Sequence, residues 1–162
     1  MGKLLAIYGP VIAAAMAANI GLPMAGSLTA VAAGLALWTL LEYVIHRFAF
    51  HGFLPHWQHH EEPRDPQYIV APLGLSGGVS AALFLLLRAV TGSWARSGLA
   101  LAGIIAGYLA YEAIHLRIHS SAAGGRWLRA LRRQHYYHHF ADDRYCYGVT
   151  TPLWDRVFGS QP

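Results

Sequence analysis

The chain has 162 residues, a length that suits one domain of ordinary size better than two. Hydrophobic residues make up 55% of it and charged residues only 12%, which is about half of the roughly 25% charged content of a soluble domain. Because the net charge of +4 comes with long apolar stretches, little room remains for a separate nucleic-acid-binding face, and we expect no nucleic-acid partner. The single cysteine, Cys146, excludes an internal disulfide and a thiolate-rich zinc or iron–sulfur site.

Four apolar segments are long enough to cross a bilayer as helices, since a helix needs about 20 apolar residues to span ~30 Å of hydrocarbon. They lie at about 4–22, 27–45, 69–87 and 97–114. Small residues within them, including Ala32 to Gly34 and Gly103 to Gly107, allow close backbone packing in lipid. We predict an all-α fold: one membrane-embedded domain over residues 1–162, built as a four-helix bundle with a cytoplasmic helical cap that carries a metal site.

All ten histidines lie in two blocks, His46 to His60 and His115 to His139. The third and fourth predicted spans separate the blocks, and an even number of crossings brings both blocks to the same face of the membrane. If that face is inside, ten of the twelve basic residues are cytoplasmic and only Arg88 and Arg96 lie outside. We therefore expect a multi-pass integral membrane protein with its histidine cluster on the cytoplasmic side.

Two histidine motifs share one spelling: HWQHH at His56 to His60 and HYYHH at His135 to His139. In a helix the first and last histidine of each motif share a face, while adjacent rings diverge by about 100°, so His59 and His60 serve two metals more easily than one. Ten neutral imidazoles suit two metals with about five ligands each, and they exceed the needs of haem or of one four-coordinate zinc. Ligand type alone leaves iron, zinc, copper and nickel open, and hydrogen-bonded structural histidines are the alternative. The predicted metal ligands are His46, His51, His56, His59, His60, His115, His119, His135, His138 and His139.

Carboxylates near the histidines are candidate partners for the outer ring nitrogens, because a ligating histidine usually donates its other N–H to such a group. Glu42 and Glu112 stand four and three residues before a predicted ligand, on the same helix face, and Asp155 is a third candidate. The alternative for each is an interfacial carboxylate or an arginine partner.

Aromatic and basic residues around the second block admit two interpretations each. Tyr111, Tyr136, Tyr137 and Trp154 are candidates for lining an acyl channel, with interfacial anchoring as the alternative. Four arginines precede the last motif, and they suit either an acidic electron donor or anionic headgroups. They are Arg126, Arg129, Arg132 and Arg133.

Read in order, the histidines form four boxes spelled HxxxxH, HxxHH, HxxxH and HxxHH. They begin at His46, His56, His115 and His135. With these boxes the chain resembles the fatty acid hydroxylase and sterol desaturase superfamily of integral-membrane di-metal enzymes. The stretch EYVIHRFAFH, the pair Tyr111-Glu112 and the tail YGVTTPLWDRVFG look like the fatty acid 2-hydroxylase branch, although the spacer Gly52 to Pro55 is shorter than in eukaryotic members.

The resemblance, which covers about Glu42 to Gly159, implies an oxidoreductase: a monooxygenase that uses two iron ions and O2 to hydroxylate a lipid, most directly a fatty acyl chain. Zinc can replace the iron during expression and be found in the purified protein. An external electron donor, cytochrome b5-like or ferredoxin-like, is also implied, and no catalytic residue beyond the metal ligands is required. Two alternatives remain: a carotenoid or sterol hydroxylase or desaturase on the same scaffold, and a non-catalytic membrane metal-binding protein.

Overall fold

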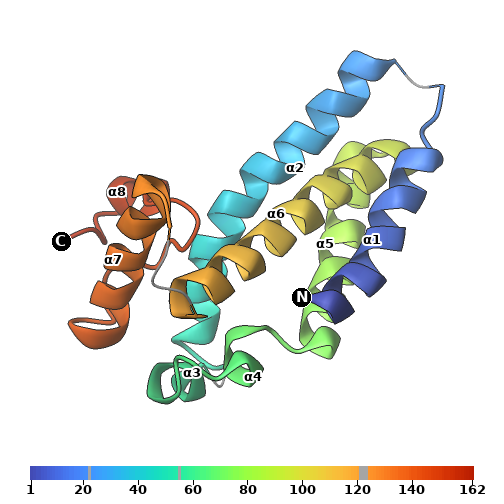
Figure 1. Cartoon of the computed structure of the whole chain (residues 1–162). Coiled ribbons are helices and arrows are strands. Elements are labelled where there is room, and N and C mark those ends of the chain that lie inside the picture. Colours follow the sequence, from blue (N-terminus) through green and yellow to red (C-terminus); the bar gives the residue numbers. More distant parts are fainter. Residues whose placement is uncertain (22, 55, 121–123) are drawn as a thin grey trace. The chain divides into compact units, whose positions relative to one another are not determined.

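The computed structural model describes residues 1–21, 23–54, 56–120 and 124–162, and within these ranges it contains helices and no strand (Figure 1). This confirms the predicted all-α class. The elements are α1 (Gly2–Ala17), α2 (Met24–Val44), the π-helix η1 (Ile45–Phe50), α3 (Trp57–Glu61), α4 (Pro66–Ile69), α5 (Leu73–Thr91), α6 (Trp94–Ser120), α7 (Arg126–Phe140) and α8 (Leu153–Val157).

Three apolar helical segments are long enough to cross a membrane: Met24–Phe50, Pro66–Thr91 and Trp94–Ser120. They contain the second, third and fourth predicted spans. The first predicted span coincides with α1, which is apolar but has only 16 residues, or about 24 Å at 1.5 Å per residue. Leu22, at its predicted end, lies outside the described residues, and a fourth crossing stays a prediction.

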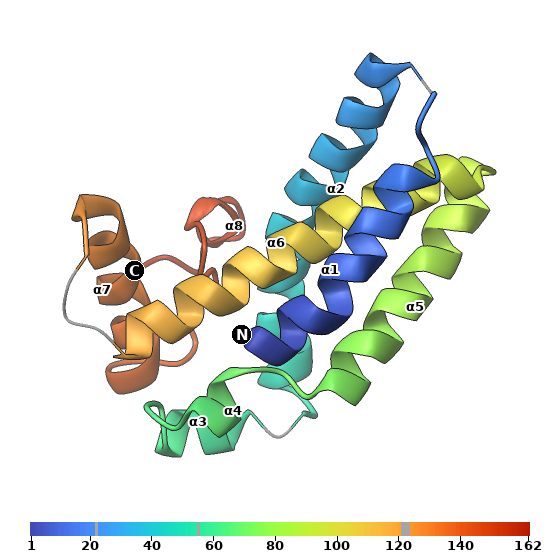
Figure 2. The ribbon, with the colours of Figure 1, turned by 45° about the vertical axis from the view of Figure 1, so that its right-hand side comes forward.

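The chain divides into two compact units, residues 1–38 with 71–109 and residues 39–70 with 110–162, and α2 and α6 contribute to both. In the first unit α6 lies beside α1 and α5 (Figure 2). The ring of Tyr8 in α1 packs edge-on against that of Tyr108 in α6, and its hydroxyl donates to Ser76 Oγ in α5 at 2.9 Å.

Small residues let α2 and α6 touch backbone to backbone in the first unit. A Cβ on Gly34 would lie 2.0 Å from the carbonyl oxygen of Ala100, and one on Gly103 would lie 2.2 Å from that of Val31. Only glycine fits at either position. The predicted close packing through small residues is therefore observed here.

In the second unit, the segment after α7 is fastened to the last residues of α2. The Trp154 indole donates to Thr39 Oγ1 at 3.0 Å, and the hydroxyls of Tyr43 and Ser160 form a 2.9 Å hydrogen bond. These bonds fix the chain end against the helix that leads into the first histidine block. Every histidine of the protein lies in this unit.

Candidate metal centre

Five histidines from three helices of the second unit converge, and we call them the first histidine group. They are His59 of α3, His115 and His119 of α6, and His135 and His139 of α7. One nitrogen of each ring lies within 4.8 Å of the others. The Nε2 atom of His135 is 3.0 Å from those of His115 and His139 and 2.9 Å from that of His119, and His59 Nε2 is 3.1 Å from His115 Nε2.

These separations fit a shared cation better than they fit hydrogen bonds. A neutral imidazole nitrogen carries either one hydrogen or one lone pair, so His135 Nε2 can satisfy one of its three short contacts but not all three. Nitrogen ligands about 2.1 Å from an ion lie about 3.0 Å apart at right angles and about 3.4 Å apart in a tetrahedron. The observed 2.9 to 3.1 Å is therefore a separation that nitrogen ligands of one cation can have.

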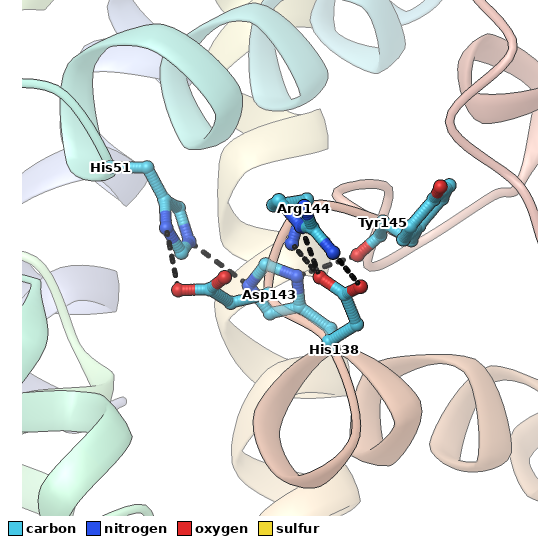
Figure 3. A network of polar contacts seen from close by, with 6 residues as sticks. His51, His138, Asp143, Arg144 and Tyr145 are labelled. Carbon is cyan, nitrogen blue, oxygen red and sulfur yellow. Dashed lines mark hydrogen bonds and ion pairs between the residues drawn. The ribbon is translucent and has the colours of Figure 1, made fainter.

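A second histidine group lies beside the first. It comprises His46, His51, His56 and His60, whose ligand nitrogens lie within 4.8 Å of one another. We add His138, because its Nε2 is 3.0 Å from His51 Nε2 and its ring centroid is 4.6 Å from that of His46. Figure 3 shows a dashed line for this contact between the His51 and His138 rings, which lie edge-on to each other.

The ten predicted ligands thus divide five and five. Adjacent histidines separate as expected from their helical geometry, since His59 belongs to the first group and His60 to the second, and His139 to the first and His138 to the second. The rings of His60 and His139 stack with centroids 4.3 Å apart, so the two groups are neighbours. The two blocks of the sequence meet in space.

The π-helix η1 explains how His46 and His51 come to serve one group. Five residues apart in an α-helix, their side chains would diverge by about 140°. Here the His51 N–H donates to the His46 carbonyl at 3.3 Å, an i to i+5 bond of the π type, and the ring centroids are 5.2 Å apart. Single π-turns inside α-helices occur often at functional sites, and this one gives the HxxxxH spacing its geometry.

The histidines are prepared to bind a cation as neutral rings. Burial lowers the pKa of His60 to about 4, that of His138 to about 3 and that of His139 to about 2, each against an ordinary value near 6.5. Burial also holds the pKa of His59 and His135 well below that value. Their nitrogens therefore keep lone pairs at physiological pH.

Two rings of the second group are oriented by backbone carbonyls. His46 Nδ1 lies 2.6 Å from the Tyr147 oxygen, and His138 Nδ1 lies 2.7 Å from the Tyr145 oxygen. A carbonyl only accepts, so each Nδ1 carries the hydrogen and each Nε2 presents a lone pair to the group. His51 Nδ1 instead faces the exposed Asp143 carboxylate at 3.9 Å (Figure 3).

The predicted outer carboxylates are buried, and two of them hold the segment after α7. Glu42 accepts from the Thr150 N–H at 2.9 Å and from the Thr150 hydroxyl at 2.7 Å. Asp155 accepts from the N–H groups of Tyr147 and Gly148 at 2.9 and 2.8 Å. Burial raises the pKa of Asp155, and its hydrogen bonds oppose that shift.

Glu112 is fully buried in α6, one turn before the ligand His115. Two of the four predicted channel aromatics also lie against the first group. The Tyr111 ring centroid is 5.4 Å from that of His115, and the Tyr136 centroid is 6.1 Å from that of His119. Tyr111 and Tyr136 therefore adjoin the first group, and their role in a substrate channel stays a prediction.

The other two predicted channel aromatics have different neighbours. Trp154 binds Thr39 and stacks on Phe158 with centroids 5.9 Å apart. Tyr137 is exposed on α7, and its ring packs edge-on near that of Tyr145. Trp154 thus contacts the end of α2 and the C-terminal segment, and Tyr137 contacts the segment after α7.

A family model described as fatty acid hydroxylase matches residues 31–160. The chain belongs to the fatty acid hydroxylase family. The matched range contains all ten histidines and the segment that follows α7. The resemblance read from the four boxes is thereby confirmed.

Among relatives of this chain, a dihydroceramide fatty acyl 2-hydroxylase of Arabidopsis thaliana is 34% identical over 143 residues, which are 82% of this chain and 60% of that protein. The fatty acid 2-hydroxylase of Rattus norvegicus is 34% identical over 139 residues, 77% of this chain and 37% of that protein. This chain therefore spans only part of the length of these relatives.

A solved structure described as full-length Scs7p, with only the hydroxylase domain visible, superimposes with a TM-score of 0.90 at 28% identity. The match covers 98% of this chain and 65% of that one. The helical arrangement described above is therefore shared with a fatty acid hydroxylase of known structure.

Some atoms of the site cannot be identified from the residue types in the sequence. Any residue supplies a carbonyl oxygen, so nothing in the composition marks Tyr145 and Tyr147 as partners of His138 and His46. The π-turn is likewise invisible to a hydrophobic period, although the five-residue spacing of HxxxxH is a usable signal for it.

Proposed function

We propose that this protein is a membrane-bound hydroxylase that uses O2 and two iron ions to convert a C–H bond of a lipid's fatty acyl chain to C–OH. The observation that carries the proposal is the pair of adjacent five-nitrogen groups in a chain of the fatty acid hydroxylase family. Relatives named as fatty acyl 2-hydroxylases support an acyl substrate, and they favour the carbon next to the carboxyl group.

The ten histidines are the proposed ligands, five to each ion. When bound, iron in such a site supplies the activation of dioxygen that hydroxylation of an unactivated carbon requires. The residues of the chain hold the geometry: His46 and His138 are kept in the tautomer that offers Nε2, and burial keeps the rings neutral. No further catalytic base or nucleophile is needed, and the donor set fits both ions.

Hydroxylation by one O2 leaves a water molecule and consumes two electrons and two protons besides the C–H bond. We propose that a cytochrome b5-like or ferredoxin-like donor supplies these electrons. Arg126, Arg129 and Arg133 lie exposed on α7, the helix whose buried face carries His135 and His138. This basic face suits an acidic donor or anionic headgroups.

Charge balance gives the buried carboxylates a role. Two divalent ions with neutral ligands bring four positive charges, and Glu42, Glu112 and Asp155 are the proposed compensating groups. Tyr111 and Tyr136 are the proposed contacts for the acyl chain, because their rings adjoin His115 and His119. Tyr137 and Trp154 stay candidates at its outer end.

We propose a single domain in which α1 joins the three longer apolar segments as a four-helix membrane bundle. The histidine-bearing helices would form a cap on the cytoplasmic side. The excess of basic residues on that side supports this orientation. An acyl chain could then reach the metal pair from within the bilayer.

Mass spectrometry of lipid extracts tests the proposal. Cells that express the protein should accumulate acyl chains with one added oxygen, and the variant His138→Ala should abolish them. Gln134→Ala, on the same helix, is the matched control and should leave them. An added oxygen on a ring terpenoid would favour the carotenoid or sterol alternative, and an unchanged lipid profile would favour a non-catalytic metal-binding protein.

A further inference from the structure

The loop at residues 145–148 contacts two ligands of one metal position. The Tyr145 carbonyl accepts from His138 and the Tyr147 carbonyl accepts from His46, and both rings belong to the second histidine group. We propose that this loop is a positioning device that sets metal binding at the second histidine group and leaves the first group unaffected. The inference rests on the proposed two-metal function.

The backbone conformation of Cys146 connects the two carbonyls. Its φ is +59°, and it is the one residue other than glycine with a positive φ in the part of the chain that the structure describes. Side chains disfavour this left-handed region, β-branched ones most of all. The Cys146 N–H donates to the Ser160 carbonyl at 2.8 Å and the side chain is buried, so the turn is held from both sides. The turn directs the Tyr145 carbonyl to His138 and the Tyr147 carbonyl to His46.

Asp155 fixes the other half of the loop. Its Oδ1 accepts from the Tyr147 N–H at 2.9 Å and from Ser160 Oγ at 2.8 Å, and its Oδ2 accepts from the Gly148 N–H at 2.8 Å. The carboxylate is 1% exposed. An asparagine here would turn an amide NH2 toward one of these donors, and that bond would be lost. The Gly148 N–H and the Tyr147 carbonyl belong to one peptide group, so Asp155 acts on His46 through the Tyr147–Gly148 peptide.

Gly148 belongs to the same device. A Cβ at this position would lie 2.2 Å from the Thr151 carbonyl oxygen and 2.8 Å from Asp155 Oδ2. Only glycine lets the backbone approach the carboxylate this closely. The pairs Tyr147-Gly148 and Trp154-Asp155 of the tail are thus explained by geometry. Gly148 contacts Asp155, and the Tyr147 carbonyl points to His46.

Four rings of the first group show no such support within the described residues. The Nδ1 atoms of His59, His115, His135 and His139 are buried and have no hydrogen-bond partner within the described ranges. The two groups are therefore inequivalent, since backbone carbonyls fix the tautomer of His46 and His138 in the second group, whereas four rings of the first group have no Nδ1 partner in the described part of the chain. A loss of ligand orientation lowers metal affinity by about 10- to 100-fold in comparable sites.

Cobalt(II) titration of the purified, metal-stripped protein tests the proposal, with visible absorption and metal analysis as readouts. Asp155→Asn and Cys146→Val should weaken one of two Co2+ sites by about 10- to 100-fold. Their one-metal spectra should match that of His60→Ala, which lacks a second-group ligand, and differ from that of His59→Ala. Cys146→Gly should bind two ions as the wild type does, because glycine adopts the turn freely. Arg144→Gln, with an exposed side chain in the adjacent position, is the control and should also bind two.

The proposal is overturned if Asp155→Asn and Cys146→Val bind two ions with wild-type affinity, or if they lose both sites together. It is also overturned if Cys146→Gly loses as much affinity as Cys146→Val, since the thiol would then matter and the turn would not. A wild-type protein that binds fewer than two Co2+ ions contradicts the proposed function itself.

Discussion

Thr150→Val probes the bond that ties the C-terminal segment to the end of α2. The substitution keeps the side-chain shape and removes the hydroxyl that donates to Glu42 Oε2 at 2.7 Å, while the backbone bond to Oε1 at 2.9 Å remains. Hydrogen bonds to charged groups contribute about 1.5–3 kcal/mol. Because Thr150 is half-buried, we expect a loss at the lower end of this range, about 1.5–2 kcal/mol in the free energy of unfolding.

For a chain of this size, each kcal/mol in the free energy of unfolding shifts the melting temperature by roughly 2–4 °C, so we expect a fall of about 3–8 °C. Thermal unfolding in detergent, followed by circular dichroism, measures it. Thr151→Val is the control: its Oγ1 accepts only a long bond from the exposed Leu153 N–H, at 3.3 Å, and the melting temperature should move by about 1 °C. Equal melting of Thr150→Val and wild type would refute the reasoning.

Three further predictions concern metal, pH and packing. Chelation should lower the melting temperature by at least about 5 °C, and added metal should restore it. A metal ion present at 100-fold its dissociation constant stabilises the folded protein by about 2.7 kcal/mol per site. An unchanged melting temperature on chelation would contradict a structural contribution of the metal. The melting temperature of the metal-free protein should fall as the pH falls below about 6.5. Histidines of the unfolded chain take up protons there, while the folded His60, His138 and His139, with pKa values of about 4, 3 and 2, do not. A melting temperature that stays constant between pH 7.5 and 5 would contradict this prediction. Gly103→Ala should destabilise the fold strongly because its Cβ would lie 2.2 Å from the Val31 oxygen, whereas Gly98→Ala, whose Cβ meets Ala15 at 3.9 Å, should be tolerated, and thermal unfolding of the pair decides it.

The helices and the meeting of the histidine blocks were accessible from the sequence because both follow from local rules. The length of the apolar segments predicts three of the spans. The rotation of about 100° between consecutive residues of a helix predicts that His59 and His60 belong to different histidine groups. The short α1 departs from its predicted span: the helix ends at Ala17, and Asn19 turns its side chain back to the Ala15 carbonyl at 2.6 Å.

The outer layer of the site was only partly accessible, because it is made by backbone atoms and long-range contacts. Asp155 stands out as a carboxylate near the last box, but its route to His46 runs through the Tyr147–Gly148 peptide, which residue types do not encode. The π-turn at His46 to His51 depends on one extra residue per turn, a feature that a period of 3.6 misses.

Anomalous scattering at the iron edge, from crystals of the iron-loaded protein, tests the central claim most directly. We predict two peaks: one surrounded by His59, His115, His119, His135 and His139, and one surrounded by His46, His51, His56, His60 and His138. A single peak, or iron bound away from these rings, would contradict a two-metal hydroxylase.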